Sequence, residues 1–205
     1  TEYHRKKRME AAKTKADALA EERRREEEDY LAILSVCTRH YMEAQQLYAN
    51  YGGWWADRAP KWNAVLPYRM KFRADAAKHA EELAEAAFEQ AMKFVHTSVL
   101  NKASLKLLRA LYAATYTRRL ALIAKLDCLR HMEEMLNKET LTNRPEELDE
   151  LRAEQKEAYA TTAAAHLQTE DRLKATKKML KVKGQDMETL FDEASKEAGD
   201  AMRKV

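Results

Sequence analysis

Two cysteines and two histidines form a repeated Cys-x-x-His pattern, and zinc binding is the chemistry that this pattern could support. The pairs are Cys37 with His40 and Cys128 with His131. The i, i+3 spacing places the thiol and the imidazole of each pair on one face of a helix. Four such ligands could form a tetrahedral zinc site if the two pairs came level across a helical bundle. Buried cysteines also pack as small hydrophobic side chains, so the same positions suit a core, which we favour over zinc.

Aromatic residues gather between positions 48 and 72, a stretch that holds all three tryptophans of the chain. Trp, Tyr and Arg are the residue types that contribute most to binding at protein interfaces. We therefore predict a partner-docking element formed by Tyr48, Tyr51, Trp54, Trp55, Arg58, Trp62 and Tyr68. Two other interpretations stay open, namely a hydrophobic plug that closes one end of a bundle and an aromatic belt at a membrane interface.

Basic residues are segregated along the chain. Positions 90–132 hold eight basic residues and one acid, and positions 172–183 hold six basic residues and no acid. Such clusters can bind the phosphate groups of RNA or of anionic lipids. The predicted contacts are Lys102, Lys106, Arg109, Arg118, Arg119, Lys177, Lys178 and Lys181. The alternative is charge pairing between helices, because positions 145–157 carry six acids against two bases.

Common catalytic and ligand-binding motifs are absent from the sequence. It contains no Glu-x-x-His repeat of the di-iron type, no His-Glu-x-x-His, no phosphate-binding loop and no nucleophile elbow. We therefore predict a protein that is not an enzyme, with no catalytic residue, no cofactor and no small-molecule substrate.

The elements that must position all these residues are long helices. The 205 residues include only four glycines and three prolines, while 35% are charged. This composition is typical of long helices, and it argues against a sheet protein or a doubly wound nucleotide-binding fold, which both need many turn residues. We expect an all-α fold, with long helices in an elongated antiparallel bundle or coiled-coil arrangement and one aromatic-rich connector. No apolar stretch is long enough for a transmembrane helix.

The few glycines and prolines divide the chain into five expected segments. Residues 1–49 form a long N-terminal helix with a continuous heptad register, in which a charged arm leads into a packed second half. Residues 50–67 form the aromatic connector. Residues 68–140 form a central helix, or a helical hairpin if the chain breaks near 98–102. Residues 141–183 form a third long helix, and residues 184–205 form a short C-terminal helix with a frayed end.

The expected function is that of a non-catalytic structural or accessory subunit of a large multi-protein assembly, acting as a helical clamp or scaffold on other protein subunits. We expect a mitochondrial energy-converting membrane complex of the ATP synthase or respiratory-chain type, in the matrix or on the matrix face of the inner membrane, and otherwise a cytoplasmic setting. Two free cysteines agree with a reducing compartment. The alternatives are a mitochondrial ribosomal protein that contacts rRNA phosphates and a membrane-curvature-binding helical dimer.

Overall fold

The computed structural model describes residues 1–58, 75–95, 97–138, 145–185 and 196. Five helices form over these ranges: α1 (Glu2–Arg58), α3 (Asp75–Phe94), α4 (Thr97–Lys102), α5 (Leu105–Lys138) and α6 (Pro145–Val182). No strand occurs among the described residues. The expected all-α fold, built from long helices that pack on one another, is therefore confirmed.

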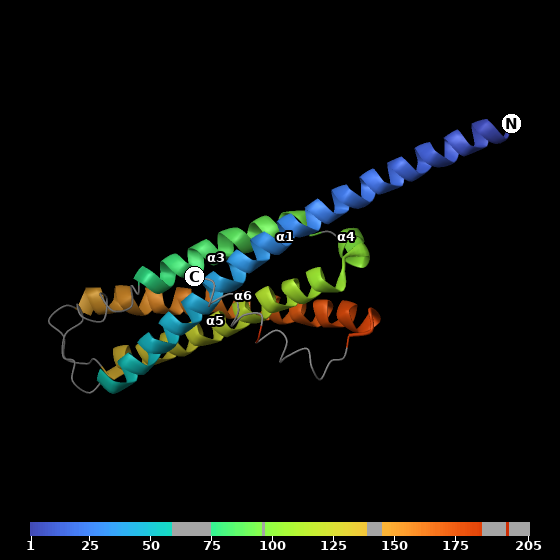
Figure 1. The fold of residues 1–205 in the computed structure, drawn as a ribbon. Helices are drawn as coiled ribbons and strands as arrows, with labels where there is room; N and C mark the ends of the chain where they lie inside the picture. Colours follow the sequence, from blue (N-terminus) through green and yellow to red (C-terminus); the bar gives the residue numbers. More distant parts are fainter. Residues whose placement is uncertain (59–74, 96, 139–144, 186–195, 197–205) are drawn as a thin grey trace.

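The helices form a bundle in which α1 packs against α3 and α5, and α5 packs in turn against α6 (Figure 1). α1 and α5 run in the same direction, and α3 and α6 run in the opposite direction. The larger core cluster contains Leu34, Tyr41 and Leu108. A smaller cluster lies farther along α5, where Met132 packs near Leu151 of α6.

Helix α1 is longer than its expected span of 1–49, because it continues to Arg58 through Gly52 and Gly53. Each glycine costs a helix about 1 kcal/mol relative to alanine, which led us to expect a break there. Tertiary contacts offset this cost. Tyr48 is buried in the larger core cluster, and Tyr51 packs against both clusters, so the turns just before the glycines are held in place.

The segment expected at 68–140 is a helical hairpin, because the chain turns back between α3 and α5 through the short helix α4. Breaks lie on both sides of the expected position, since α3 ends at Phe94 and α5 begins at Leu105. Ser104 caps the start of α5, where its hydroxyl accepts the Leu107 N–H at 3.2 Å. The Ser104 N–H donates to a carboxylate oxygen of Glu27 in α1 at 2.9 Å. A residue of another helix thus completes a capping box.

Helix α6 begins at Pro145, followed by Glu146 and Glu147 in its first turn, all of which favour a helix start. It ends at a Schellman cap: Gly184 has φ of 82°, and the Gln185 N–H donates to the Leu180 carbonyl at 3.0 Å. Nearly all of the short helix predicted at 184–205 lies outside the described residues.

The face of α6 toward the bundle is partly polar, as its sequence indicates. Thr162, Thr169 and Thr176 are buried at heptad spacing, and each hydroxyl donates to the carbonyl four residues earlier at 2.7–2.8 Å. These bonds satisfy the hydroxyls within the helix. The small side chains then let α6 lie close to α5.

Candidate interaction surfaces

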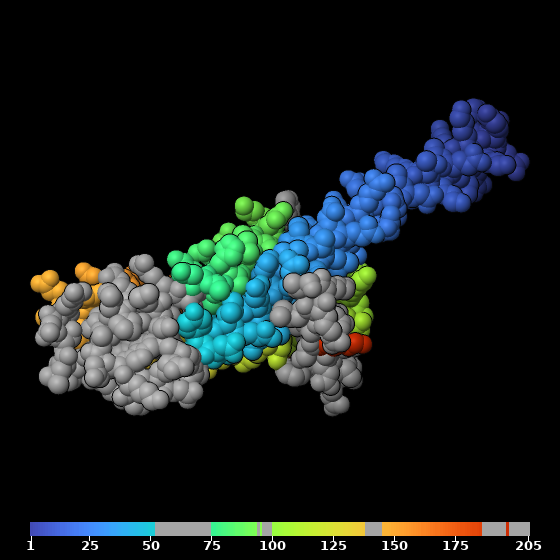
Figure 2. All heavy atoms as spheres, turned by 60° about the vertical axis from the view of Figure 1, so that its left-hand side comes forward, coloured from blue at the N-terminus to red at the C-terminus, as the bar shows by residue number. Residues whose placement is uncertain are grey.

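The first part of α1, residues 2–26 and here called the arm, extends beyond the bundle (Figures 1 and 2). All residues from 1 to 20 are exposed, including Met9 at 65% and Leu19 at 48%. Ala12 and Ala16 complete an apolar stripe with them at heptad spacing. Side chains such as Met9 and Leu19 normally lie against a neighbour in a stable helix, because packing supplies most helical stability. The arm is therefore a candidate interaction surface.

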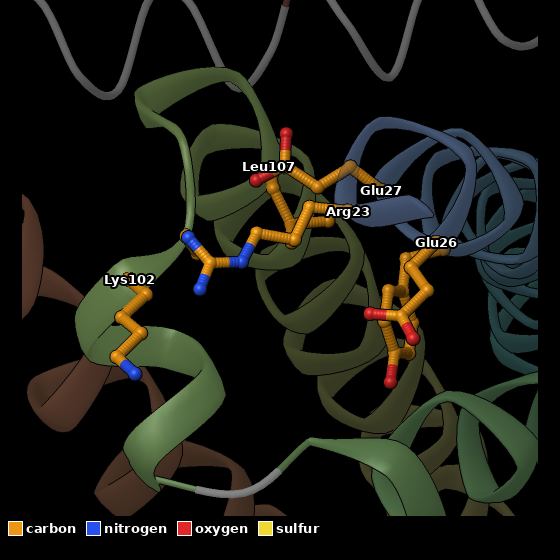
Figure 3. Close-up of a pocket in the computed structure, with 7 residues that line it drawn as sticks. Arg23, Glu26, Glu27, Lys102 and Leu107 are labelled. Carbon is orange, nitrogen blue, oxygen red and sulfur yellow. The ribbon is translucent and has the colours of Figure 1, made fainter. Parts of the chain in front are cut away.

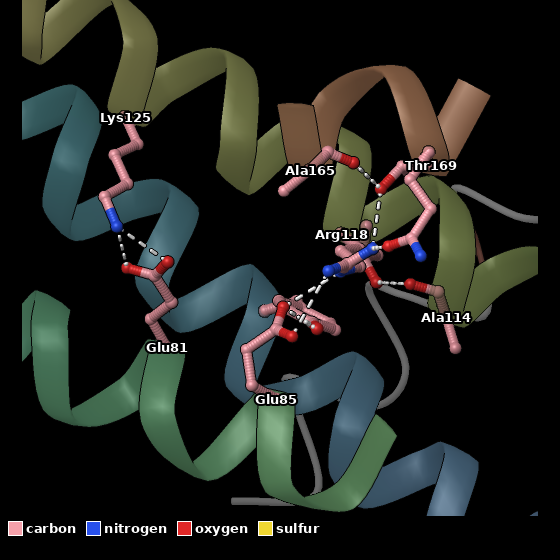
Figure 4. A network of polar contacts seen from close by, with 10 residues as sticks. Glu81, Glu85, Ala114, Arg118, Lys125, Ala165 and Thr169 are labelled. Carbon is pink, nitrogen blue, oxygen red and sulfur yellow. Dashed lines mark hydrogen bonds and ion pairs between the residues drawn. The ribbon is translucent and has the colours of Figure 1, made fainter. Parts of the chain in front are cut away.

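Two partly buried contacts of similar design, here called the clasps, join α1, α3 and α5 (Figure 4). In the first, Glu85 of α3 accepts hydrogen bonds from the Tyr41 hydroxyl and from the Arg118 guanidinium. In the second, Glu81 accepts hydrogen bonds from the Tyr48 hydroxyl and the Lys125 ammonium group.

The clasps repeat at helical spacing. The tyrosines are seven residues apart on α1, the cations are seven residues apart on α5, and the glutamates are four apart on α3. The same alignment of α1, α3 and α5 therefore produces both clasps.

Arg118 lies at the centre of the bundle. Its Nε and Nη2 atoms contact the two oxygens of Glu85 at 2.9 and 3.2 Å, and Nη1 donates to the Thr169 hydroxyl of α6 at 2.9 Å. The guanidinium also lies over the Phe88 ring, 4.9 Å from its centroid. Burial is the largest single effect and opposes the charge of Arg118, but its hydrogen bonds to Glu85 and the charge of that carboxylate, together with the contribution of Tyr41, outweigh burial, so the pKa of Arg118 is raised. The residue is a fixed cation that links four helices.

Burial also affects the tyrosines of the clasps. Desolvation raises the pKa of Tyr41 and of Tyr48, and the negative charge of the adjacent glutamate raises each further. Both phenols therefore stay protonated and donate to the carboxylates.

The residues of the predicted aromatic docking element have separate positions. Tyr48 is buried in the core, and Tyr51 is half-buried against both core clusters, so neither is free to dock a partner. Trp54, Trp55 and Arg58 belong to the last turns of α1, but their side chains lie outside the described residues. Trp62 and Tyr68 lie outside them altogether. For the tyrosines, the alternative of core packing is the one that the structure shows.

Three of the predicted phosphate contacts are engaged within the molecule. Arg118 is buried in its clasp, Arg119 pairs with Glu170 of α6, and Arg109 Nε donates to the Gln185 amide oxygen at 2.8 Å. For Arg118 the prediction is wrong, because a residue that is 6% exposed cannot reach a phosphate surface. Sequence alone shows a run of basic residues. It does not show that residues of α3 and α6 pair with them.

The other five predicted contacts remain exposed at one end of the bundle. Lys183 Nζ donates to the Ala103 carbonyl at 2.6 Å, which holds the end of α6 beside the start of α5. The exposed lysines around this junction are here called the lysine cluster and comprise Lys102, Lys106, Lys177, Lys178 and Lys181. This cluster is a positively charged surface next to the base of the arm.

The two Cys-x-x-His pairs do not meet. The offset of 77 residues that places Glu27 against Ser104 also relates Tyr41 to Arg118, so it puts Cys128 level with Tyr51. Cys37 lies fourteen residues before Tyr51, which is about 21 Å along the helix axis. The four predicted zinc ligands, with His40 and His131, therefore do not share a site. Within the described part of the chain, no group of three or more metal-binding side chains comes together.

A pocket of about 200 Å³ lies at the base of the arm (Figure 3). The Arg23 side chain extends from α1 toward α4, where Lys102 lies. The Glu26 side chain lies on the side of the pocket away from Lys102. This volume suits a side chain, since pockets for small ligands run from about 300 Å³.

A larger cavity of about 660 Å³ lies between α3 and α6, and Lys125, Cys128 and Tyr48 are among the residues that line it. Burial raises the pKa of the Cys128 thiol to about 11, so at neutral pH this cysteine is protonated and weakly nucleophilic. The cavity therefore offers polar contacts but no activated thiol.

Sequence reasoning missed the glutamates that organise the bundle, namely Glu27, Glu81 and Glu85. A signal exists for the last two: they are spaced i, i+4 beside the alanine face of α3 that Ala77, Ala80 and Ala84 form. An acid at the edge of an apolar face is a candidate for an interhelical pair. For Glu27 no signal exists, because its partner is a backbone N–H distant in sequence.

Comparison with protein-family models, with curated proteins and with solved structures finds no match. Among the described residues, no helix has the length and apolar character needed to cross a membrane. The function must therefore be argued from the surfaces themselves.

Proposed function

We propose that this chain is a non-catalytic structural subunit of a large multi-protein assembly, in which the arm docks on a helix of a neighbouring subunit. The observation that carries the proposal is the exposed arm, with its stripe of Met9, Ala12, Ala16 and Leu19 at heptad spacing. A second helix that packed on this stripe would bury these side chains as in a coiled coil. The bundle anchors the arm, and the arm reaches the neighbour.

The stability of the anchor supports a scaffold role. The clasps and the Ser104 cap tie α1 to α3 and α5 on both sides of the Tyr41 turn. Ion pairs such as Arg24 with Glu21 and with Glu28 support the helix near the base of the arm. These features hold the arm in a fixed direction, as a clamp or spacer requires.

The experiment is capture of native complexes with the tagged full chain. Met9→Glu with Leu19→Glu places charges on the stripe and should abolish capture of the neighbouring subunits. Ala11→Glu with Ala18→Glu adds the same charges at exposed positions beside the stripe and should leave capture intact. Equal capture by both variants would contradict a docking role for the arm.

The mitochondrial setting stays a prediction, and so does membership of an ATP synthase or respiratory-chain complex. Two measurements test these predictions: the compartment in which the tagged chain accumulates, and the identity of the proteins captured with it. Capture of subunits of an energy-converting complex is the expected result, and capture of ribosomal subunits would favour the alternative.

A second candidate function is contact with rRNA phosphates, favoured by the exposed lysine cluster. Lysines bind the phosphate backbone without reading bases, and such binding weakens steeply as salt rises. The affinity for structured RNA should therefore fall steeply between low and physiological salt. Lys177→Gln with Lys178→Gln and Lys181→Gln should reduce both the affinity and its salt dependence, and an affinity that does not change with salt would reject this function.

A further inference from the structure

The two halves of the arm region carry opposite net charge. Residues 1–15 contain six basic and two acidic side chains, and residues 16–29 contain three basic and seven acidic ones. The net charges are therefore +4 and −4. A parallel partner with this sequence would place like charges side by side, whereas an antiparallel partner would place the basic half of one helix against the acidic half of the other.

The apolar stripe is compatible with the same orientation. In an antiparallel register that puts Met9 of one arm opposite Leu19 of another, Ala12 falls opposite Ala16. All four apolar positions then pair with one another, and the alanines allow the helices to approach closely. Arg8 flanks this stripe on the same side as Glu22 of the other arm, which adds an attractive pair on each side of the two-fold axis.

The bundle leaves room for this pairing. The register places Arg5 of one arm level with Arg23 of the other, where α1 first lines a pocket with α4, and α5 begins at the level of Glu27, where Ser104 makes its contact. Two arms can therefore overlap over residues 6–22 before they meet the bundle of the opposite molecule.

We infer that the helix on which the arm docks is the arm of a second copy of this chain, paired in the antiparallel direction. This inference rests on the proposed docking role of the arm and names its partner. Lys13 and Lys15 face their own copies near the two-fold axis, where like charges oppose pairing. These contacts weaken the association, so it is reversible in isolation.

Sedimentation equilibrium of the purified full chain over about 5–500 µM measures this association. We expect a monomer–dimer equilibrium for the natural sequence and for Ala11→Glu with Ala18→Glu, and a monomer throughout for Met9→Glu with Leu19→Glu. A natural chain that stays monomeric over the whole range overturns the inference. In that case, loss of complex capture by the stripe variant would still support docking on a different subunit, so the two proposals fail separately.

Disulfide cross-linking determines the orientation. Cys37 and Cys128 are buried, so single cysteines introduced as Ala12→Cys or Ala16→Cys in differently tagged chains are the exposed thiols. In the antiparallel register, oxidation of the mixture should join Ala12→Cys to Ala16→Cys, and neither variant should join its own copies. Cross-links between two copies of Ala12→Cys would show a parallel pair and overturn the inference.

Discussion

Replacement of Arg118 by methionine should lower the free energy of unfolding far more than the same change at the adjacent Arg119. Both arginines are ion-paired, and methionine keeps a long, flexible, apolar side chain with good helix propensity at either position. The Arg118 and Glu85 side chains are 7% and 32% exposed, whereas those of Arg119 and Glu170 are 35% and 31% exposed. The comparison therefore isolates the burial of the guanidinium.

Arg118→Met removes two hydrogen bonds to Glu85, one to Thr169 and a long one to Gln168, and it leaves the carboxylate without its cation. Breaking a fully buried pair costs about 3–5 kcal/mol, and because Glu85 is one-third exposed we place the loss at about 2–3 kcal/mol. Arg119→Met breaks a pair in which both side chains are about one-third exposed, and solvent screening keeps the loss to about 1 kcal/mol.

Urea unfolding followed by circular dichroism at 222 nm measures both losses, provided that the slope of the transition is unchanged. A triple variant, Arg118→Met with Glu85→Leu and Tyr41→Phe, should recover most of the loss, because neither an uncompensated charge nor an unpaired Tyr41 hydroxyl remains. Equal losses for the two single variants, or no recovery in the triple variant, would show that the first clasp contributes no more than a surface ion pair.

Three further predictions concern the cap, the clasp tyrosines and the end of α6. Glu27→Gln should destabilise the chain by about 1 kcal/mol in urea unfolding, because Ser104 N–H loses its charged acceptor, and an unchanged midpoint would contradict the cap. Since Tyr41 and Tyr48 have raised pKa values when folded, stability should fall above pH 10, where unfolded tyrosines ionise, by about 1.4 kcal/mol per pH unit for each phenol. The double change to phenylalanine should flatten this alkaline decline, as measured by urea midpoints from pH 8 to 11. Gly184→Ala should lower the free energy of unfolding by about 1 kcal/mol through backbone strain alone, because φ is 82° and an added Cβ meets no atom within 4 Å. An unchanged free energy of unfolding would refute that strain.

The fold class follows from composition, since few residues in the chain can end a helix. The positions of the ends are harder to predict. Gly52 and Gly53 resemble a break, but their cost is local, and the burial of Tyr48 just before them belongs to the tertiary structure. The sum of helix propensities along the chain includes the local cost of the two glycines but not the stabilisation that comes from the burial of Tyr48.

The heptad pattern of α1 predicts the packed side only in part. Of its positions, Cys37 and Ala44 are fully buried and Ile33 and Leu47 are half-buried. Leu34, Tyr41 and Tyr48, which lie beside this register and widen its apolar stripe, belong to the core as well. α1 packs against both α3 and α5. Its contact face is therefore wider than that of a helix in a two-stranded coiled coil. Similarly, the partners of the basic residues depend on which helices are neighbours, and spacing in sequence does not specify this.

The continuity of α1 has a mechanical consequence. The arm and the clasped part are one helix with no joint between them, so the arm behaves as a lever whose fulcrum is the bundle. Its 25 residues from 2 to 26 extend about 38 Å, and a tilt of about 5° at the base would move the tip by about 3 Å. Glu81 and Glu85 lie on α3, which does not contact the tip of the arm. A change in either residue that tilts α1 would therefore still displace that tip.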